Sequence, residues 1–171
     1  FMWFGTDDGL NRFNGLEIKV FKKIIDDSLS LSHNGILSLL SDSYGDLWIG
    51  TNGGGLNKFI PHKNEFIRFV HKDEKINPHN NFELSNNIVR VIFEDSKQNL
   101  WIGTDEGLNL YDRKTATFKK FGINEGLKNE RVWTIVEDRE GLLWIGTYGG
   151  GLFSFNSSTL KFEQIQDFDV N

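Results

Sequence analysis

Cysteine is absent from the chain, proline is rare, and no long apolar run occurs. With no cysteine among its 171 residues, the protein forms neither disulfide bonds nor thiolate metal sites. No apolar stretch approaches the roughly 18 residues that a membrane-spanning helix needs, so we expect no membrane contact by this segment. The net charge is only −5 and the basic residues are scattered, which argues against nucleic-acid binding.

Glycine and aromatic residues are plentiful, and they recur in a repeated phrase. Gly occurs 18 times, and aromatic residues make up 13% of the chain. The phrase reads Trp, then Ile or Phe, then Gly and Thr, and its four copies begin at Trp3, Trp48, Trp101 and Trp144. These tryptophans are 45, 53 and 43 residues apart, a period typical of the four-stranded blades of a β-propeller. The sequence therefore predicts an all-β propeller fold.

Alignment on the tryptophans predicts four strands per blade, named A to D here. Strand A is an apolar run rich in β-branched residues, expected at 36–40, 89–93 and 132–136. Strand B carries the phrase, and a glycine-containing loop leads to strand C, expected at 10–13, 56–59, 108–111 and 152–155. Strand D is expected at 18–21, 66–69, 118–121 and 162–165. Its apolar residues alternate poorly, which predicts a bulge or twist in that strand.

The repeats predict one partial propeller over residues 1–171. Its four blades are expected at 1–22, 36–70, 88–122 and 131–166. The chain begins inside a repeat, so the first blade lacks its innermost strand A. Propellers usually close with about 4 to 8 blades, and we therefore expect an open arc of a larger propeller. Its exposed edges would pair with the remaining blades of a longer parent chain or with a second copy.

Residues present in every copy are expected to build the fold. The four tryptophans share one register, which favours buried packing between blades over contact with a ligand. Six residues before three of them stands an aspartate, at Asp42, Asp95 and Asp138. Each aspartate opens a tight turn in which its side chain can accept hydrogen bonds from backbone amides.

The sequence pattern of the repeat resembles that of the two-component regulator propeller repeat. The third copy reads Leu84-Ser-Asn-Asn-Ile-Val89, then Asn99-Leu-Trp-Ile-Gly-Thr104, then Gly107-Leu-Asn-Leu-Tyr111. The resemblance covers essentially the whole chain. It implies a periplasmic sensor segment of a bacterial hybrid histidine kinase, responding to oligosaccharides and not itself an enzyme. The resemblance transfers no binding residue, because the family does not fix which blades bind ligand.

Candidate binding residues are those that change from copy to copy on one face. The D–A and B–C loops share the face where propellers most often bind small ligands. At the entry to strand A the aligned residues are Asn34, Asn87 and Glu130, followed by Leu37, Arg90 and Trp133. Tyr148 lies in a glycine-rich B–C loop. An aromatic face with arginine and asparagine donors suits a sugar, whereas the alternative is that Trp133 fills a core gap and Arg90 is solvated.

The insertion 71–83 is a further candidate, because it lengthens the second interval. It contains His71 and His79. Long polar insertions on a rigid scaffold often serve in recognition, although many are passive surface loops. The spacing of the two histidines matches no metal-ligand motif, so we expect neither a metal site nor a cofactor.

Two other functions stay open at this point. A propeller glycoside hydrolase or lyase needs two carboxylates facing each other across the scissile bond. The acidic residues lie mostly in turns, and Glu130 alone is expected near the channel. A protein-interaction scaffold is the other alternative, because many propellers serve in that role.

Overall fold

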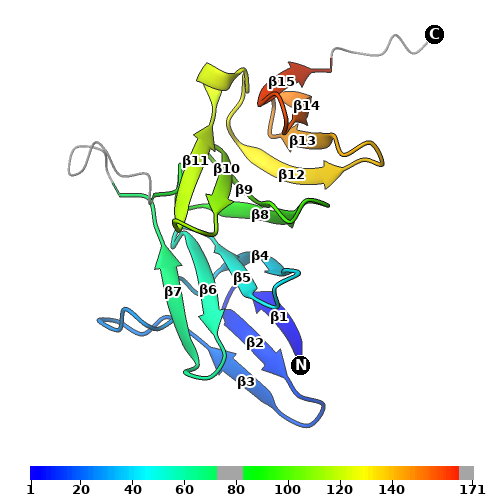
Figure 1. Ribbon diagram of the computed structural model, residues 1–171. Helices are drawn as coiled ribbons and strands as arrows, with labels where there is room; N and C mark the ends of the chain where they lie inside the picture. Colours follow the sequence, from blue (N-terminus) through cyan, green and yellow to red (C-terminus); the bar gives the residue numbers. More distant parts are fainter. Residues whose placement is uncertain (73–82, 166–171) are drawn as a thin grey trace.

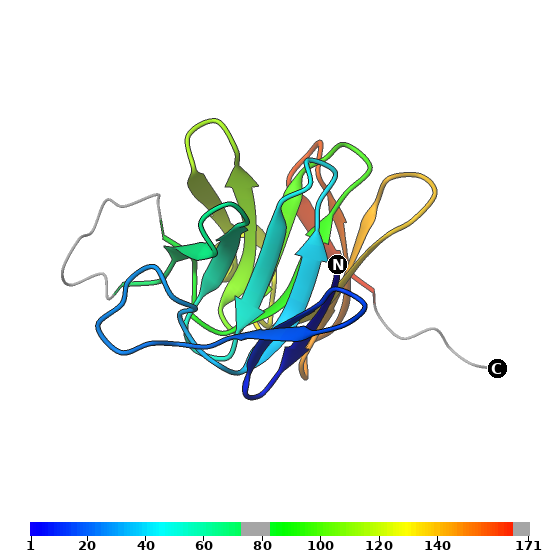
Figure 2. The same ribbon diagram turned by 90° about the horizontal axis from the view of Figure 1, so that it is seen from below.

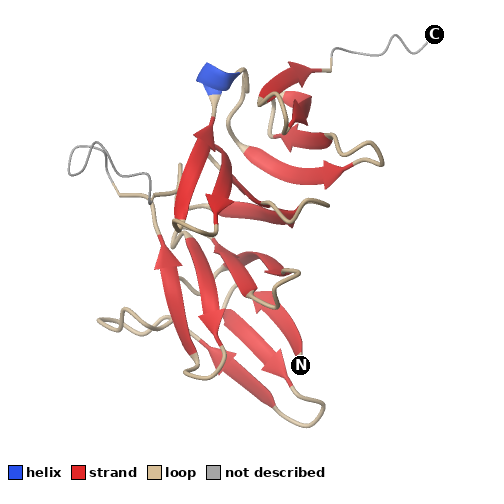
Figure 3. Ribbon diagram, viewed as in Figure 1, coloured by secondary structure: helices blue, strands red, loops and turns tan. Residues whose placement is uncertain are grey.

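The protein is almost entirely β-structure, arranged as four antiparallel sheets (Figure 1, Figure 3). A computed structural model describes residues 1–72 and 83–165. Within these residues the helical structure is limited to one 3-10 turn, η1 (Ile123–Glu125). No helix of this described part is long and apolar enough to cross a membrane. The predicted all-β fold is confirmed.

Each sheet corresponds to one repeat. The first sheet holds β1 (Met2–Thr6), β2 (Gly9–Phe13) and β3 (Ile18–Phe21). The second holds β4 (Ile36–Ser41), β5 (Leu47–Thr51), β6 (Leu56–Ile60) and β7 (Glu65–Phe69). The third holds β8 (Val89–Glu94), β9 (Leu100–Thr104), β10 (Gly107–Asp112) and β11 (Thr117–Phe121). The fourth holds β12 (Val132–Glu137), β13 (Leu143–Thr147), β14 (Gly151–Asn156) and β15 (Lys161–Gln164).

The sheets follow one another as the blades of a propeller do. Within each sheet every strand pairs with the next strand of the chain, and the first sheet has three strands. The innermost strands of neighbouring sheets contact each other: β1 contacts β4, β4 contacts β8, and β8 contacts β12. Figure 1 shows the sheets in chain order from blue to red, and Figure 2 shows the first sheet nearest the viewer.

The bulge lies in strand A, so of the bulge or twist expected in strand D the bulge was wrong. Strand D pairs in a regular register in all four sheets. The register instead shifts where strand A meets strand B, and the unpaired extra residues are Leu37, Arg90 and Trp133. A bulge of this kind re-aims the extra side chain out of the sheet alternation. The poor apolar alternation of strand D reflects its place at the outer edge of each blade.

The tryptophans of the phrase pack between neighbouring sheets. Trp48 and Trp101 are fully buried, whereas Trp3 and Trp144, in the two outer sheets, are half-buried. Trp48 contacts Tyr111 of the next sheet edge to face, with 5.1 Å between ring centroids. Trp101 contacts Phe155 of the following sheet in the same manner at 5.3 Å. This edge-to-face geometry is favourable for aromatic pairs and adds to the stabilisation that their burial provides.

The aspartate before each tryptophan joins the A–B turn to the indole. The indole Nε1 of Trp48 donates to Asp42 Oδ2 at 2.7 Å, and the equivalent bonds in the third and fourth sheets are 2.8 Å. The other oxygen, Oδ1, accepts two backbone amides of its turn in all three cases. The indole bond, followed by the turn amides, lowers the pKa of Asp138. The Asp138 carboxylate is therefore held in its charged form.

Glycine and threonine of the phrase also have fixed structural tasks. A Cβ on Gly103 would lie 2.6 Å from side-chain atoms of Val91 and Val132, on its own and the next strand A. The hydroxyl of Thr104 donates to the carbonyl of Gly107 at 3.0 Å and closes the B–C loop. The same threonine bond recurs in the other three sheets. The phrase therefore specifies blade packing.

Candidate functional site

The D–A and B–C loops meet on one face of the arc. The amide of Gly55, in the B–C loop of the second sheet, donates to the carbonyl of Asn87 at 2.8 Å. The amide of Gly107, in the next B–C loop, donates to the carbonyl of Glu130 at 2.7 Å. These two B–C loops are thus fixed to the D–A segment of the following blade. Variable side chains from two neighbouring blades come together on this face.

Arg90 is directed by its bulge toward the B–C loop of its own sheet. Its guanidinium donates two hydrogen bonds to Asp105, from Nε to Oδ1 and from Nη2 to Oδ2, the latter at 3.0 Å. The bond to Asp105 raises the pKa of Arg90, and burial opposes this only in part. Arg90 therefore carries its charge throughout the physiological pH range.

Trp133 and Tyr148 of the fourth sheet stack on each other beside this ion pair. Their ring centroids are 5.2 Å apart with an angle of 26° between the planes, and both rings are half-exposed. The guanidinium carbon of Arg90 lies 4.9 Å from the Trp133 ring centroid. That of Arg131 lies 5.3 Å from the Tyr148 ring centroid, and its Nε is 3.8 Å from Asp105 Oδ2. We call Arg90, Asp105, Arg131, Trp133 and Tyr148 the inter-blade cluster.

The inter-blade cluster unites three predicted site residues with two that sequence reasoning missed. Arg90, Trp133 and Tyr148 were predicted because they depart from the repeat. Asp105 and Arg131 were missed, although both lie in the loops that the strand order places on this face. An acidic residue directly after the Trp-Ile-Gly-Thr phrase, opposite an arginine in strand A, was the available signal for Asp105.

The structure places the aligned residues Asn34, Asn87 and Glu130 against the backbone. Their side-chain oxygens accept the amides that lie two residues beyond strand D, those of Lys23 (2.7 Å), His71 (2.7 Å) and Ile123 (2.9 Å). The shared requirement at this position is an acceptor oxygen, which both Asn and Glu supply. These oxygens therefore fasten the D–A link in three successive blades.

The histidines of the insertion do not assemble into a site in the described residues. His71 Nδ1 is 3.0 Å from the carbonyl oxygen of Leu84, which anchors the ring to the start of the next blade. His79 lies outside the described residues. Across residues 1–72 and 83–165, no group of three His, Asp or Glu side chains is arranged to hold a metal ion.

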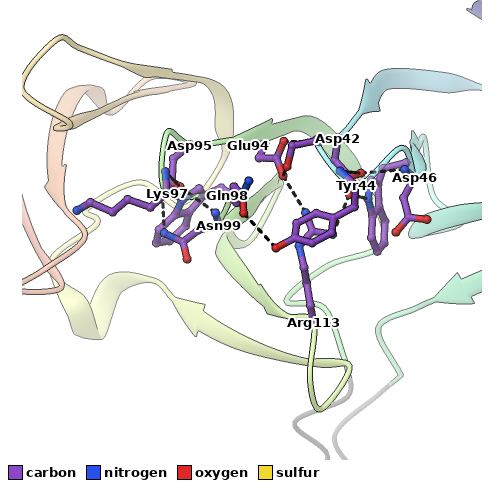
Figure 4. Close-up of polar contacts among 12 residues, drawn as sticks. Asp42, Tyr44, Asp46, Glu94, Asp95, Lys97, Gln98, Asn99 and Arg113 are labelled. Carbon is purple, nitrogen blue, oxygen red and sulfur yellow. Dashed lines mark hydrogen bonds and ion pairs between the residues drawn. The ribbon is translucent and has the colours of Figure 1, made fainter.

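A second polar network occupies the opposite face, where the A–B turns lie (Figure 4). Arg113 reaches from the C–D turn of the third sheet and donates to Asp42 of the second sheet and to Glu94, at 2.8 and 3.0 Å. Its guanidinium also lies 4.4 Å from the ring centroid of Tyr44, whose hydroxyl donates to Gln98 at 3.1 Å. Glu94 in turn accepts the amide and hydroxyl of Ser43. This network holds the two blades together.

The repeats match a known family model. The two component regulator propeller model matches residues 30–53, 83–106 and 126–149, which contain the three Trp-Ile-Gly-Thr copies of the repeated phrase. The chain belongs to the two-component regulator propeller family. A curated relative, histidine kinase P4 of Formosa agariphila, is 36% identical over 126 residues, which is 70% of this chain and 9% of the kinase.

Solved structures of bacterial extracellular domains have the same arrangement of blades. The extracellular domain of the hybrid two component system BT3049 from B. thetaiotaomicron is 26% identical, with a TM-score of 0.83 over 96% of this chain. The extracellular domain of BT4673 from the same organism is 26% identical, with a TM-score of 0.78 over 95%. This regulator-propeller chain spans 23% of each of those domains. Virginiamycin B lyase of Staphylococcus aureus, at 14% identity and a TM-score of 0.65, shows the shared fold alone.

Proposed function

We propose that this regulator-propeller chain is an extracytoplasmic, ligand-sensing segment of a bacterial two-component signalling protein, and that its ligand is an oligosaccharide. The location is supported by the two B. thetaiotaomicron relatives, which are extracellular domains of signalling systems. We assign the segment to the periplasm. The parent protein would be a histidine kinase, as the Formosa relative is.

The inter-blade cluster carries the ligand proposal. Elsewhere in the described residues the shared positions of the repeat serve packing, turn closure or loop fastening. Here two half-exposed aromatic rings and two guanidinium groups converge from two blades. Aromatic rings next to fixed donors are suited to the apolar faces and hydroxyl groups of a sugar.

Signalling would follow from the position of the inter-blade cluster across a blade boundary. Arg90 and Asp105 belong to the third sheet, whereas Arg131, Trp133 and Tyr148 belong to the fourth. A ligand that contacts both sheets favours one arrangement of the blades over another. Only such differential affinity can shift the equilibrium that the kinase reads.

Binding without cleavage is supported by the state of the two nearest carboxylates. Asp105 is held by Arg90, and Glu130 accepts the amide of Ile123. A glycosidase needs one carboxyl group free to protonate the leaving group and a second to attack or to activate water. Turnover of an oligosaccharide that disappears in Glu130→Gln would support an enzyme instead.

The outer faces of the first and fourth sheets are proposed to meet further blades of the parent chain or a second copy. Phe4 is exposed, whereas its counterparts Ile49 and Ile102 in the second and third sheets are buried. Leu152 is likewise exposed where Leu56 is buried. Both faces are therefore apolar surfaces of the kind that neighbouring blades cover elsewhere in the arc.

Isothermal titration calorimetry with an oligosaccharide panel tests the proposal on the protein that carries this segment. We expect Trp133→Ala to weaken binding about tenfold or more, which corresponds to ~1.4 kcal/mol. Leu37→Ala is the matched control, because Leu37 is the bulged residue of the second sheet and lies outside the inter-blade cluster. If no oligosaccharide binds and kinase output does not respond, the sensor proposal fails.

A further inference from the structure

The chemical class of the ligand follows from a hollow beside the inter-blade cluster. The hollow measures about 420 Å³ and is lined by Tyr148, Arg131, Asn129, Lys128, Glu130 and Asp105, among others. Its size falls within the roughly 300 to 1,000 Å³ typical of small-ligand sites. Tyr148 and Arg131 place it directly against the cluster.

Most acceptor groups of the hollow are already used within the protein. Both carboxylate oxygens of Asp105 accept hydrogen bonds from Arg90. Glu130 Oε1 accepts the amide of Ile123, and Asn129 Oδ1 accepts the amide of Arg131 at 3.0 Å. A ligand entering here meets few free acceptors.

The donor groups, by contrast, are largely unused. Arg131 makes no side-chain hydrogen bond within the described residues, because its approach to Asp105 is 3.8 Å, and its side chain is 46% exposed. No bond from Asn129 Nδ2 is found in that part of the chain either. Lys128 Nζ donates one of its three hydrogens to Gln164 Oε1 at 2.7 Å, which leaves two hydrogens for a ligand. The hollow therefore offers N–H groups in excess.

The charges of the hollow point the same way. Arg131 and Lys128 line the hollow with two positive charges, and Asp105 and Glu130 line it with two negative ones. The charge of Asp105 is paired with Arg90, which lies outside the hollow, so the two cations face one carboxylate that has no ion-pair partner among the described residues, that of Glu130. An excess positive charge surrounded by free donors suits an anion. A guanidinium fork matches the geometry of a carboxylate and binds it with two parallel hydrogen bonds.

We propose that the hollow binds the carboxylate of an acidic sugar, a uronic acid unit of the oligosaccharide, with Arg131 as its main partner. Asn129 and Lys128 add donors to the carboxylate or ring hydroxyls, and Tyr148 borders the sugar ring. This inference rests on the proposed function, because it names the class of oligosaccharide that the same face recognises.

The test compares trigalacturonic acid with its methyl ester by calorimetry on the protein that carries this segment. We expect the acid to bind about tenfold to a hundredfold more tightly than the ester, as a charge-assisted hydrogen bond implies. Arg131→Gln should remove that difference, so that the variant binds acid and ester with equal affinity. Arg139→Gln, which removes an exposed arginine from the opposite A–B turn, should preserve the difference.

The outcomes separate this inference from the proposed function. Equal affinities for acid and ester would overturn the carboxylate assignment while the oligosaccharide proposal stands. A preference for the acid that survives Arg131→Gln would overturn the choice of Arg131 and of the hollow. Succinate binding as tightly as trigalacturonic acid would replace a sugar by a simple organic acid. Binding of no saccharide at all would remove both proposals.

Discussion

Replacing Arg113 with serine removes a guanidinium that joins the second and third sheets. Its Nη1 donates to Asp42 Oδ2 at 2.8 Å, and its Nη2 donates to Glu94 Oε1 at 3.0 Å (Figure 4). Serine already stands at the corresponding position of the fourth sheet, Ser157, so the turn itself accepts the change. The variant therefore isolates the loss of the ion pairs.

The cost follows from the burial of the pair. The Asp42 side chain is 0% exposed and that of Arg113 is 22% exposed. Removing one partner of a fully buried pair typically costs about 3 to 5 kcal/mol. Asp42 keeps its indole and amide donors, and solvent partly screens Arg113, so we expect about 2 to 3 kcal/mol. For a chain of this size that corresponds to a fall in Tm of about 4 to 12 °C.

The loss should depend on pH in a defined direction. Burial raises the pKa of Asp42, but the bonds from Trp48, Arg113 and the Asp46 amide together outweigh burial and leave the pKa lowered. The carboxylate therefore adds stability above the ordinary pKa of Asp, and this contribution disappears as the pH falls through the lower folded-state pKa. The difference between wild type and Arg113→Ser should be largest near neutral pH and should shrink in acid.

Urea unfolding followed by tryptophan fluorescence measures this difference in stability between about pH 3 and pH 7. The lower limit of about pH 3 lies below the ordinary pKa of Asp. Lys114→Ser is the control, because the neighbouring lysine makes no ion pair within the described residues and should change stability by less than about 0.5 kcal/mol. A loss for Arg113→Ser that stays constant across this pH range would refute the ionic explanation.

Four further substitutions test the packing of the repeat by thermal unfolding. Ala116→Gly should stabilise the protein by about 0.5 to 1 kcal/mol, because φ is 55° there; unchanged or lower stability would contradict this. Gly103→Ala should destabilise by about 1 to 3 kcal/mol through the clash with strand A, and a neutral result would disprove it. Trp101→Phe keeps an aromatic ring but leaves Asp95 without its indole donor, for an expected loss of about 1 to 2 kcal/mol. Asp138→Asn should flatten the decline of stability in acid, since the lowered pKa no longer contributes.

Sequence reasoning was most successful where the signal was repeated and local. The A to D strands were predicted because each copy shows the same apolar runs at the same distance from tryptophan. The bulge was misplaced because register depends on the partner strand as well as on the strand's own alternation. Leu37, Arg90 and Trp133 already stood out as aligned departures, yet their shared bulge became visible only from the pairing of strands A and B.

The sequence by itself determined the repeat, the strand order and the face on which variable loops lie, because these depend on period and chain direction. Only the tertiary structure decided which variable residues meet. Arg90 and Trp133 lie far apart in the chain, and they come together because β8 and β12 are neighbours. The structure also showed that Asn34, Asn87 and Glu130 bond to backbone amides, because a side chain's hydrogen bonds depend on where a neighbouring loop passes.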